Sequence, residues 1–152
     1  MPFEEKYTWV QLVVMAIVPV AYFAVVLPQL AATPAAEIAY QLPMIIAIVA
    51  SIILTIVGTI VMSIGTAVSA EIAEPGSAEY LEIDRTDERD KDIGRRGELA
   101  GYYVSSVGVV VVLILTMMQF PYFWIASVLY LSFASAAIVS ASVKLVAYRR
   151  GF

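Results

Sequence analysis

The chain has 152 residues, 61% of them hydrophobic, and a formal net charge of −4. Three stretches carry no formal charge: residues 7–36, 38–70 and 99–143. A soluble domain of this length could not bury so much apolar surface, so a membrane protein is expected. The chain contains neither cysteine nor histidine. Disulfides, thiolate metal sites and histidine-based haem, zinc or proton-shuttle sites are therefore excluded.

Residues 9–30 form the first of four predicted membrane spans. Pro19 lies inside this span, and proline lacks the amide proton that a helix interior needs, so a bend near Pro19 is expected. A cleaved signal peptide is the alternative for this region. The net-negative start and the long apolar stretch argue against it. We therefore expect the first span to be retained.

The second span, residues 43–68, carries a hydroxyl side chain at every fourth position over three turns: Ser51, Thr55, Thr59 and Ser63. Four-residue spacing keeps these side chains on one helical face. They could form the polar lining of a narrow pathway. Alternatively, they could allow close helix packing and hydrogen-bond across a contact or to their own backbone. We favour packing and keep the pathway as the alternative.

Residues 71–98 are the one substantial polar segment, and they predict a cytoplasmic loop followed by a helix extension. The sequence E-P-G-S at 74–77 is typical of a turn, and Thr86 is suited to capping a helix. No proline occurs between residues 86 and 120. One long helix is therefore expected to begin near Thr86 and to continue into the third span, residues 102–118.

The first turns of that long helix carry charged side chains of both signs. Asp92 precedes Arg96 by four residues, a spacing that favours an ion pair on a helix, and Asp87 precedes Lys91 in the same way. One interpretation is a solvated helix that its own ion pairs stabilise. The other is a docking surface for a partner's acidic groups or for lipid phosphates. The residues of this surface would be Asp87, Arg89, Lys91, Arg95 and Arg96.

A metal site is not expected in this segment. A calcium loop needs oxygen ligands at alternating positions with a central glycine and a terminal glutamate. The acids between Asp84 and Asp92 do not follow that order, and on a helix they would point in several directions.

The run T-D-E-R-D-K-D-I-G-R-R-G-E at 86–98, followed by Tyr102, Tyr103 and an apolar helix, resembles a known motif. It is similar to the central motif, of the type D-E-R-D-x-x-I-x-x-R, of small bacterial four-helix integral membrane proteins of unknown function. The resemblance implies the four-span topology. It implies no activity, substrate or catalytic residue.

Small residues recur where the third helix begins, and they are expected to pack closely against another helix: Gly97, Gly101, Ser105 and Gly108. The fourth span, residues 122–143, is also rich in Ser and Ala. Pro121 should end one helix and open the next. A tight antiparallel hairpin is therefore expected, although one small-residue face could instead join two copies of the chain.

Basic residues predict the orientation of the four spans. All nine lie in the N-terminal tail, the 71–98 segment or the C-terminus, and none lies in the loops 31–42 and 119–121. Because lysine and arginine are retained on the cytoplasmic side, both termini should be cytoplasmic. The aromatic residues Tyr40, Phe123 and Trp124 should then lie at the outer membrane interface.

The sequence therefore predicts an all-α polytopic protein, a single membrane domain of residues 1–152 built as two helical hairpins in the plasma (inner) membrane. An enzyme is not expected, because the chain has no histidine or cysteine and every acid and base except Glu37 lies in the predicted cytoplasmic segments or at their edges. No span holds an ionisable residue at mid-depth, which argues against coupled transport. We expect an accessory or regulatory protein that binds a protein or lipid partner through helix 86–98. The alternative is an oligomeric channel or transporter lined by the hydroxyl face. Neither a cofactor nor a nucleic-acid partner is expected.

Overall fold

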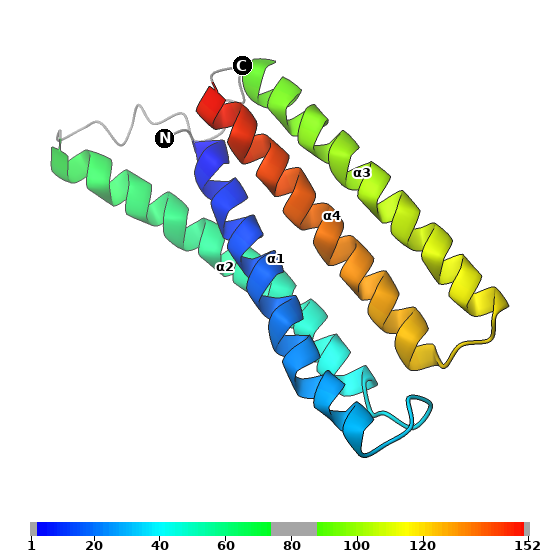
Figure 1. Ribbon diagram of the computed structural model, residues 1–152. Helices are drawn as coiled ribbons and strands as arrows, with labels where there is room; N and C mark the ends of the chain where they lie inside the picture. Colours follow the sequence, from blue (N-terminus) through cyan, green and yellow to red (C-terminus); the bar gives the residue numbers. More distant parts are fainter. Residues whose placement is uncertain (1–2, 74–87, 151–152) are drawn as a thin grey trace.

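The structure, a computed structural model, describes residues 3–73 and 88–150. Within these residues the chain folds into four α-helices and one short 3-10 helix (Figure 1). The elements are α1 (Phe3–Val26), η1 (Leu27–Ala31), α2 (Gln41–Ala73), α3 (Glu88–Met117) and α4 (Tyr122–Arg150). The predicted all-α class is confirmed. The predicted turn at 74–77, the cap at Thr86 and the Asp87 side chain lie outside the described residues.

Each of the four helices is long and apolar enough to cross a membrane. α2 has 33 residues and α3 has 30. At about 1.5 Å per residue both are longer than the roughly 30 Å hydrocarbon core of a bilayer. The helices extend beyond the predicted spans, and α3 is the expected long helix that joins the charged segment to the third span. These lengths are consistent with a multi-pass membrane protein.

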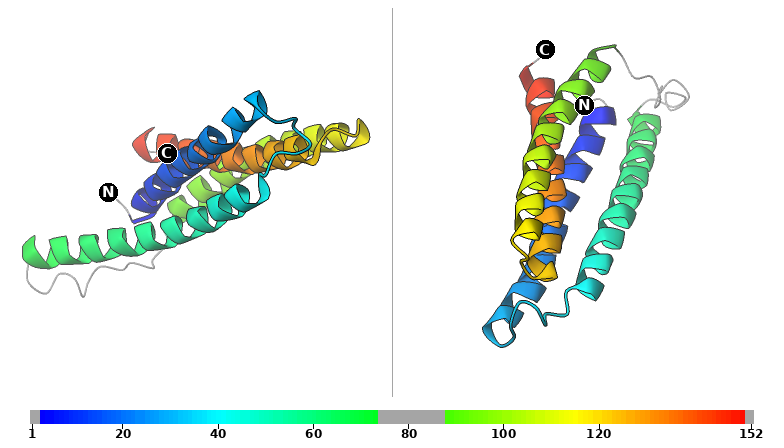
Figure 2. Two further views of the ribbon diagram at one scale, coloured as in Figure 1. Left: turned by 90° about the horizontal axis from the view of Figure 1, so that it is seen from below. Right: turned by 90° about the vertical axis from the view of Figure 1, so that its right-hand side faces the viewer.

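The helices lie in the order α3, α4, α1, α2, each packed against the next. α4 contacts both α3 and α1, and α2 packs chiefly on α1 (Figures 1 and 2). The start of α1 and the end of α4 lie at one end of the bundle, where α3 also starts (Figure 1). The two connections 27–40 and 118–121 lie at the opposite end.

The connection between α3 and α4 is a tight turn at the predicted place. Gln119 has a left-handed backbone with φ of 57°. Its N–H donates to the carbonyl of Thr116 at 3.1 Å, and the N–H of Phe120 donates to the carbonyl of Leu115 at 3.1 Å. This pair of bonds is a Schellman motif, which satisfies carbonyls at a helix end. Pro121 follows and precedes the first residue of α4.

The apolar core lies toward the end of the bundle that holds the connections. Its buried residues are Val14, Val18, Tyr22, Val26, Ile38, Ala47 and Phe123. Phe123, expected from the sequence at the depth of the outer membrane interface, is only 1% exposed and belongs to this core. The ring of Tyr40, from the 31–40 connection, packs edge-on against Phe123 at 5.8 Å between centroids and helps to bury it.

Most apolar side chains outside this core face outward. Along α2 the exposed side chains include Ile45, Ile53 and Val61, each more than half exposed. Soluble monomers rarely expose contiguous apolar surface on this scale, because its contact with water is unfavourable. Lipid tails would cover it without that cost. The exposed apolar surface of the bundle therefore supports a membrane environment, as the helix lengths do.

Candidate functional site

The first three turns of α3, residues 88–98, are termed here the charged start of α3. One face of this segment is buried through Ile93 and Gly97, and Gly101 continues that face one turn further. Because these residues recur every four positions, they form a single stripe along the helix. Lys91, Asp92, Arg95 and Arg96 lie on the other faces and are exposed, and Arg89, four positions before Ile93, is exposed where the helix begins. The charged start is therefore anchored on one side and displays charge on the other.

Asp92 and Glu98 of this segment each form an ion pair. The predicted pair of Asp92 with Arg96 is present at 3.7 Å, with both side chains largely exposed. An exposed pair of this kind contributes about 0.2–1 kcal/mol. A second pair joins Glu98 of α3 to Lys144 of α4 at 3.8 Å, and its lysine is half-buried. The sequence did not indicate this second pair, because its partners are far apart in the chain.

Three glycines place α3 directly against α4. A Cβ atom added at Gly101 would lie 3.0 Å from the carbonyl oxygen of Ala136, and one added at Gly97 would lie 2.8 Å from that of Ser140. A Cβ at Gly108 would overlap the side chain of Ser132. The α4 residues in contact recur every four positions, so two stripes of small residues meet along one line. The charged start is therefore held to α4 at backbone-contact distance.

Ser105, the fourth member of the small-residue set, makes a local bond. It is half-buried, and its hydroxyl donates to the carbonyl of Tyr102 at 2.9 Å within α3.

On the hydroxyl face of α2, three of the four side chains donate to the backbone of their own helix. Thr55 donates to the carbonyl of Ser51 at 2.7 Å, Thr59 to that of Thr55 at 2.7 Å, and Ser63 to that of Thr59 at 2.8 Å. The donors are half-buried. Their hydroxyl protons are thus committed to their own backbone, which leaves only oxygen lone pairs for another group. Gly58, between two of them, lies against Val10 of α1.

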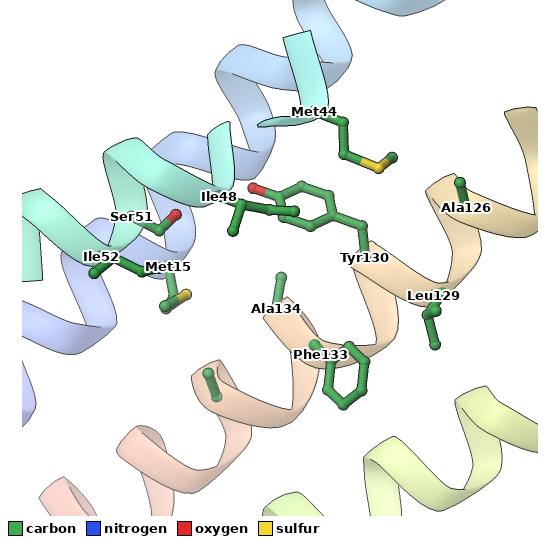
Figure 3. A pocket seen from close by; sticks show the side chains of 11 residues that line it. Met15, Met44, Ile48, Ser51, Ile52, Ala126, Leu129, Tyr130, Phe133 and Ala134 are labelled. Carbon is green, nitrogen blue, oxygen red and sulfur yellow. The ribbon is translucent and has the colours of Figure 1, made fainter. Parts of the chain in front are cut away.

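A crevice of about 430 Å³ lies where α2, α1 and α4 meet, and most of its lining is apolar. Figure 3 shows the ring of Tyr130 extending from α4 toward α2, between Met44 and Ile48. Ser51, 6% exposed, is the side chain of α2 that faces the Tyr130 hydroxyl. The buried Tyr130 oxygen nevertheless makes no hydrogen bond of normal length to any described residue.

Basic side chains from three helices gather at the end of the bundle where the charged start of α3 lies. Lys6 Nζ of α1 donates to Thr66 Oγ1 of α2 at 2.8 Å. The guanidinium of Arg149 lies 5.6 Å from the centre of the Trp9 ring, a cation–π contact between α4 and α1. The sequence assigned these cations to one membrane side but did not indicate their partners. Glu5 and Thr8 are buried nearby in α1, which the sequence also did not predict.

Arg96 of α3 and Arg150 of α4 line a second crevice, of about 330 Å³. We call it the Arg96–Arg150 crevice. Its other lining residues come from α4: Ser142, Val143, Val146 and Ala147. Only Arg96 was singled out from the sequence, because residues 54 positions apart show no pattern that would join them.

No group of three or more potential metal-ligating side chains occurs in residues 3–73 and 88–150. Comparison of the chain with protein-family models, with curated proteins and with solved structures found no match. The resemblance of residues 86–98 to the four-helix bacterial family therefore stays a prediction. The function has to be inferred from the surfaces described above.

Proposed function

We propose that this protein is a small accessory or regulatory membrane protein that binds a partner, a protein or lipid headgroups, through the charged start of α3. It crosses the plasma membrane of a bacterial cell four times as two hairpins, with both termini cytoplasmic, and it catalyses no reaction. The bacterial membrane is the location that the resemblance of residues 86–98 implies.

The distribution of charge supports this orientation. Lys6, the charged start of α3 and the last turn of α4 lie at one end of the bundle. The connections 27–40 and 118–121, at the other end, contain no lysine or arginine. Retention of basic segments on the cytoplasmic side would place the charged end inside the cell.

The main support for this proposal is that the charged start of α3 is packed against α4. Gly97 and Gly101 of its buried stripe lie against the backbone of α4, while Arg89, Arg95 and Arg96 are exposed. A surface held rigid before binding loses less conformational entropy when a partner docks. Arginine is also suited to this role, because its planar fork can bind carboxylates or phosphates through two hydrogen bonds.

Purification of tagged protein from native membranes in mild detergent tests this proposal. We expect a stoichiometric partner that is lost from the variant Arg89→Glu/Arg95→Glu. The variant Arg89→Lys/Arg95→Lys is the matched control, because it keeps both positive charges and should keep most of the partner. Recovery of bare protein from the wild type, or equal recovery of the partner from both variants, would contradict the proposal.

A further inference from the structure

We propose that the Arg96–Arg150 crevice binds the headgroup phosphate of one anionic phospholipid. The crevice lies between the charged start of α3 and the last turns of α4, which run side by side (Figure 1). One arginine comes from each helix, and the floor of the crevice is formed by Ser142, Val143, Val146 and Ala147 of α4. Two cations therefore flank a mostly apolar floor.

Two arginines suit a phosphodiester group. Each guanidinium presents several N–H donors in a fixed plane and can make paired hydrogen bonds to phosphate oxygens. Arg96 pairs with Asp92 at 3.7 Å, and this pair is largely exposed and therefore weak. Glu98 is paired instead with Lys144, and neither of these lines the crevice. Among the described residues, the lining of the crevice thus includes two basic side chains and no acidic one.

The depth of the crevice favours a lipid over a soluble anion. Gly97 of α3 contacts Ser140 and Lys144 of α4, so Arg96 lies close to the level of these residues. Residues 99–143 carry no charge, and the crevice thus sits at the edge of the apolar part of both helices. Headgroup phosphates lie at this level of a bilayer. An acyl chain could then extend from the headgroup along Val143 and Val146.

The charge of the crevice also selects among lipids. Basic residues near a membrane surface attract anionic lipids. A zwitterionic lipid carries its own ammonium group, which would oppose two guanidiniums. Phosphatidylglycerol, with a net negative phosphodiester and no ammonium, fits better. The site rests on the proposed membrane insertion, but it does not require the proposed protein partner.

Native mass spectrometry of the detergent-purified full chain, titrated with phosphatidylglycerol, phosphatidylcholine or inorganic phosphate, tests the site. We expect one phosphatidylglycerol to bind to the wild type at least tenfold more tightly than phosphatidylcholine, and no competition from inorganic phosphate. The variant Arg96→Gln/Arg150→Gln should lose at least tenfold in affinity for phosphatidylglycerol. Filling the floor with Ser142→Phe should lower that affinity while leaving both arginines in place.

The matched control is Lys6→Gln/Arg149→Gln, which removes the same charge from the same end of the bundle but from outside the crevice and the charged start of α3. Arg149 lies over Trp9 of α1, and neither residue lines the crevice. This control should bind phosphatidylglycerol within about twofold of the wild type. Circular dichroism and thermal unfolding should establish that every variant compared is folded.

Three results would overturn the site. Equal losses of phosphatidylglycerol affinity in both double variants would indicate diffuse electrostatic attraction. Equal affinity for phosphatidylcholine would indicate a site that binds acyl chains alone. Competition by inorganic phosphate would indicate a soluble ligand. Partner recovery from Arg96→Gln/Arg150→Gln separates the two proposals. If the partner is retained while lipid binding fails, the proposed function stands without this site. If the partner is absent from the wild type while the lipid binds, the site stands alone.

Discussion

The phenol oxygen of Tyr22 in α1 lies 3.2 Å from the hydroxyl oxygen of Ser127 in α4, and both side chains are buried. This hydrogen bond joins the first half of the chain to the second within the bundle. The ring of Tyr130 lies 5.3 Å from that of Tyr22, measured between centroids. Its buried hydroxyl makes no normal hydrogen bond to the described part of the chain. Within the described residues, Tyr22 thus makes a hydroxyl hydrogen bond that its neighbour Tyr130 lacks.

Tyr22→Phe should therefore destabilise the protein, and Tyr130→Phe should not. Loss of the hydrogen bond with Tyr22 leaves the buried Ser127 hydroxyl with one partner fewer. Such a change lowers the free energy of unfolding by about 0.5–1.5 kcal/mol. Removing the Tyr130 hydroxyl relieves an unsatisfied polar atom and should be neutral or stabilising. Equilibrium unfolding in detergent micelles measures both variants. Equal destabilisation by the two would contradict this assignment of hydrogen bonds.

Close packing of α3 on α4 predicts that a larger side chain at Gly101 destabilises the bundle. A Cβ there already approaches the Ala136 backbone, so Gly101→Leu must push the helices apart, at a cost of about 1–3 kcal/mol. Gly65→Leu is the control, because nothing lies within 4 Å of a Cβ at that position. Thermal unfolding should show a lowered midpoint for Gly101→Leu alone. A similar fall in both variants would mean that leucine itself, not the helix contact, is responsible.

The hydroxyl face of α2 gives a test of the channel alternative. Thr55 and Thr59 donate to their own backbone, so the double variant Thr55→Val/Thr59→Val should still fold. We expect it to transport no ions, and we expect the same of the wild type. Liposomes holding the purified wild type at high density should show no ion flux above empty liposomes. A wild-type flux that this double variant changes would instead favour an oligomeric channel lined by α2.

Three features were predicted correctly from the sequence: the fold class, the turn at Pro121, and one long helix that runs from the charged segment into the third span. Each of these depends on local chemistry: a charge-free stretch, a proline, or an uninterrupted helical run. The glycines at positions 97, 101 and 108 were also singled out as a packing stripe. Small residues are a reliable signal in membrane helices, because they alone allow backbones to approach closely.

The partners of α1 and α2 were much harder to predict. When all faces of a helix are apolar, hydrophobic periodicity no longer separates buried positions from lipid-facing ones. The burial of Phe123 in the core was therefore not predicted. The central place of α4, in contact with both α3 and α1, likewise has no local signal. The same limit applies to the Arg96–Arg150 crevice, which exists only because two distant helix ends meet.

The orientation of the bundle is the premise on which the docking surface and the lipid site both depend. The chain contains no cysteine, so a single introduced cysteine is its only thiol. Two exposed positions serve as probes: Ala36, in the connection between η1 and α2, and Asp92, in the charged start of α3. Neither substitution removes a lysine or arginine, so the charges that determine orientation stay unchanged.

Labelling of intact cells with a membrane-impermeant maleimide tests this orientation directly. Ala36→Cys should react in intact cells, whereas Asp92→Cys should react only after the membrane is permeabilised. Reaction of Asp92→Cys in intact cells, with protection of Ala36→Cys, would contradict the account.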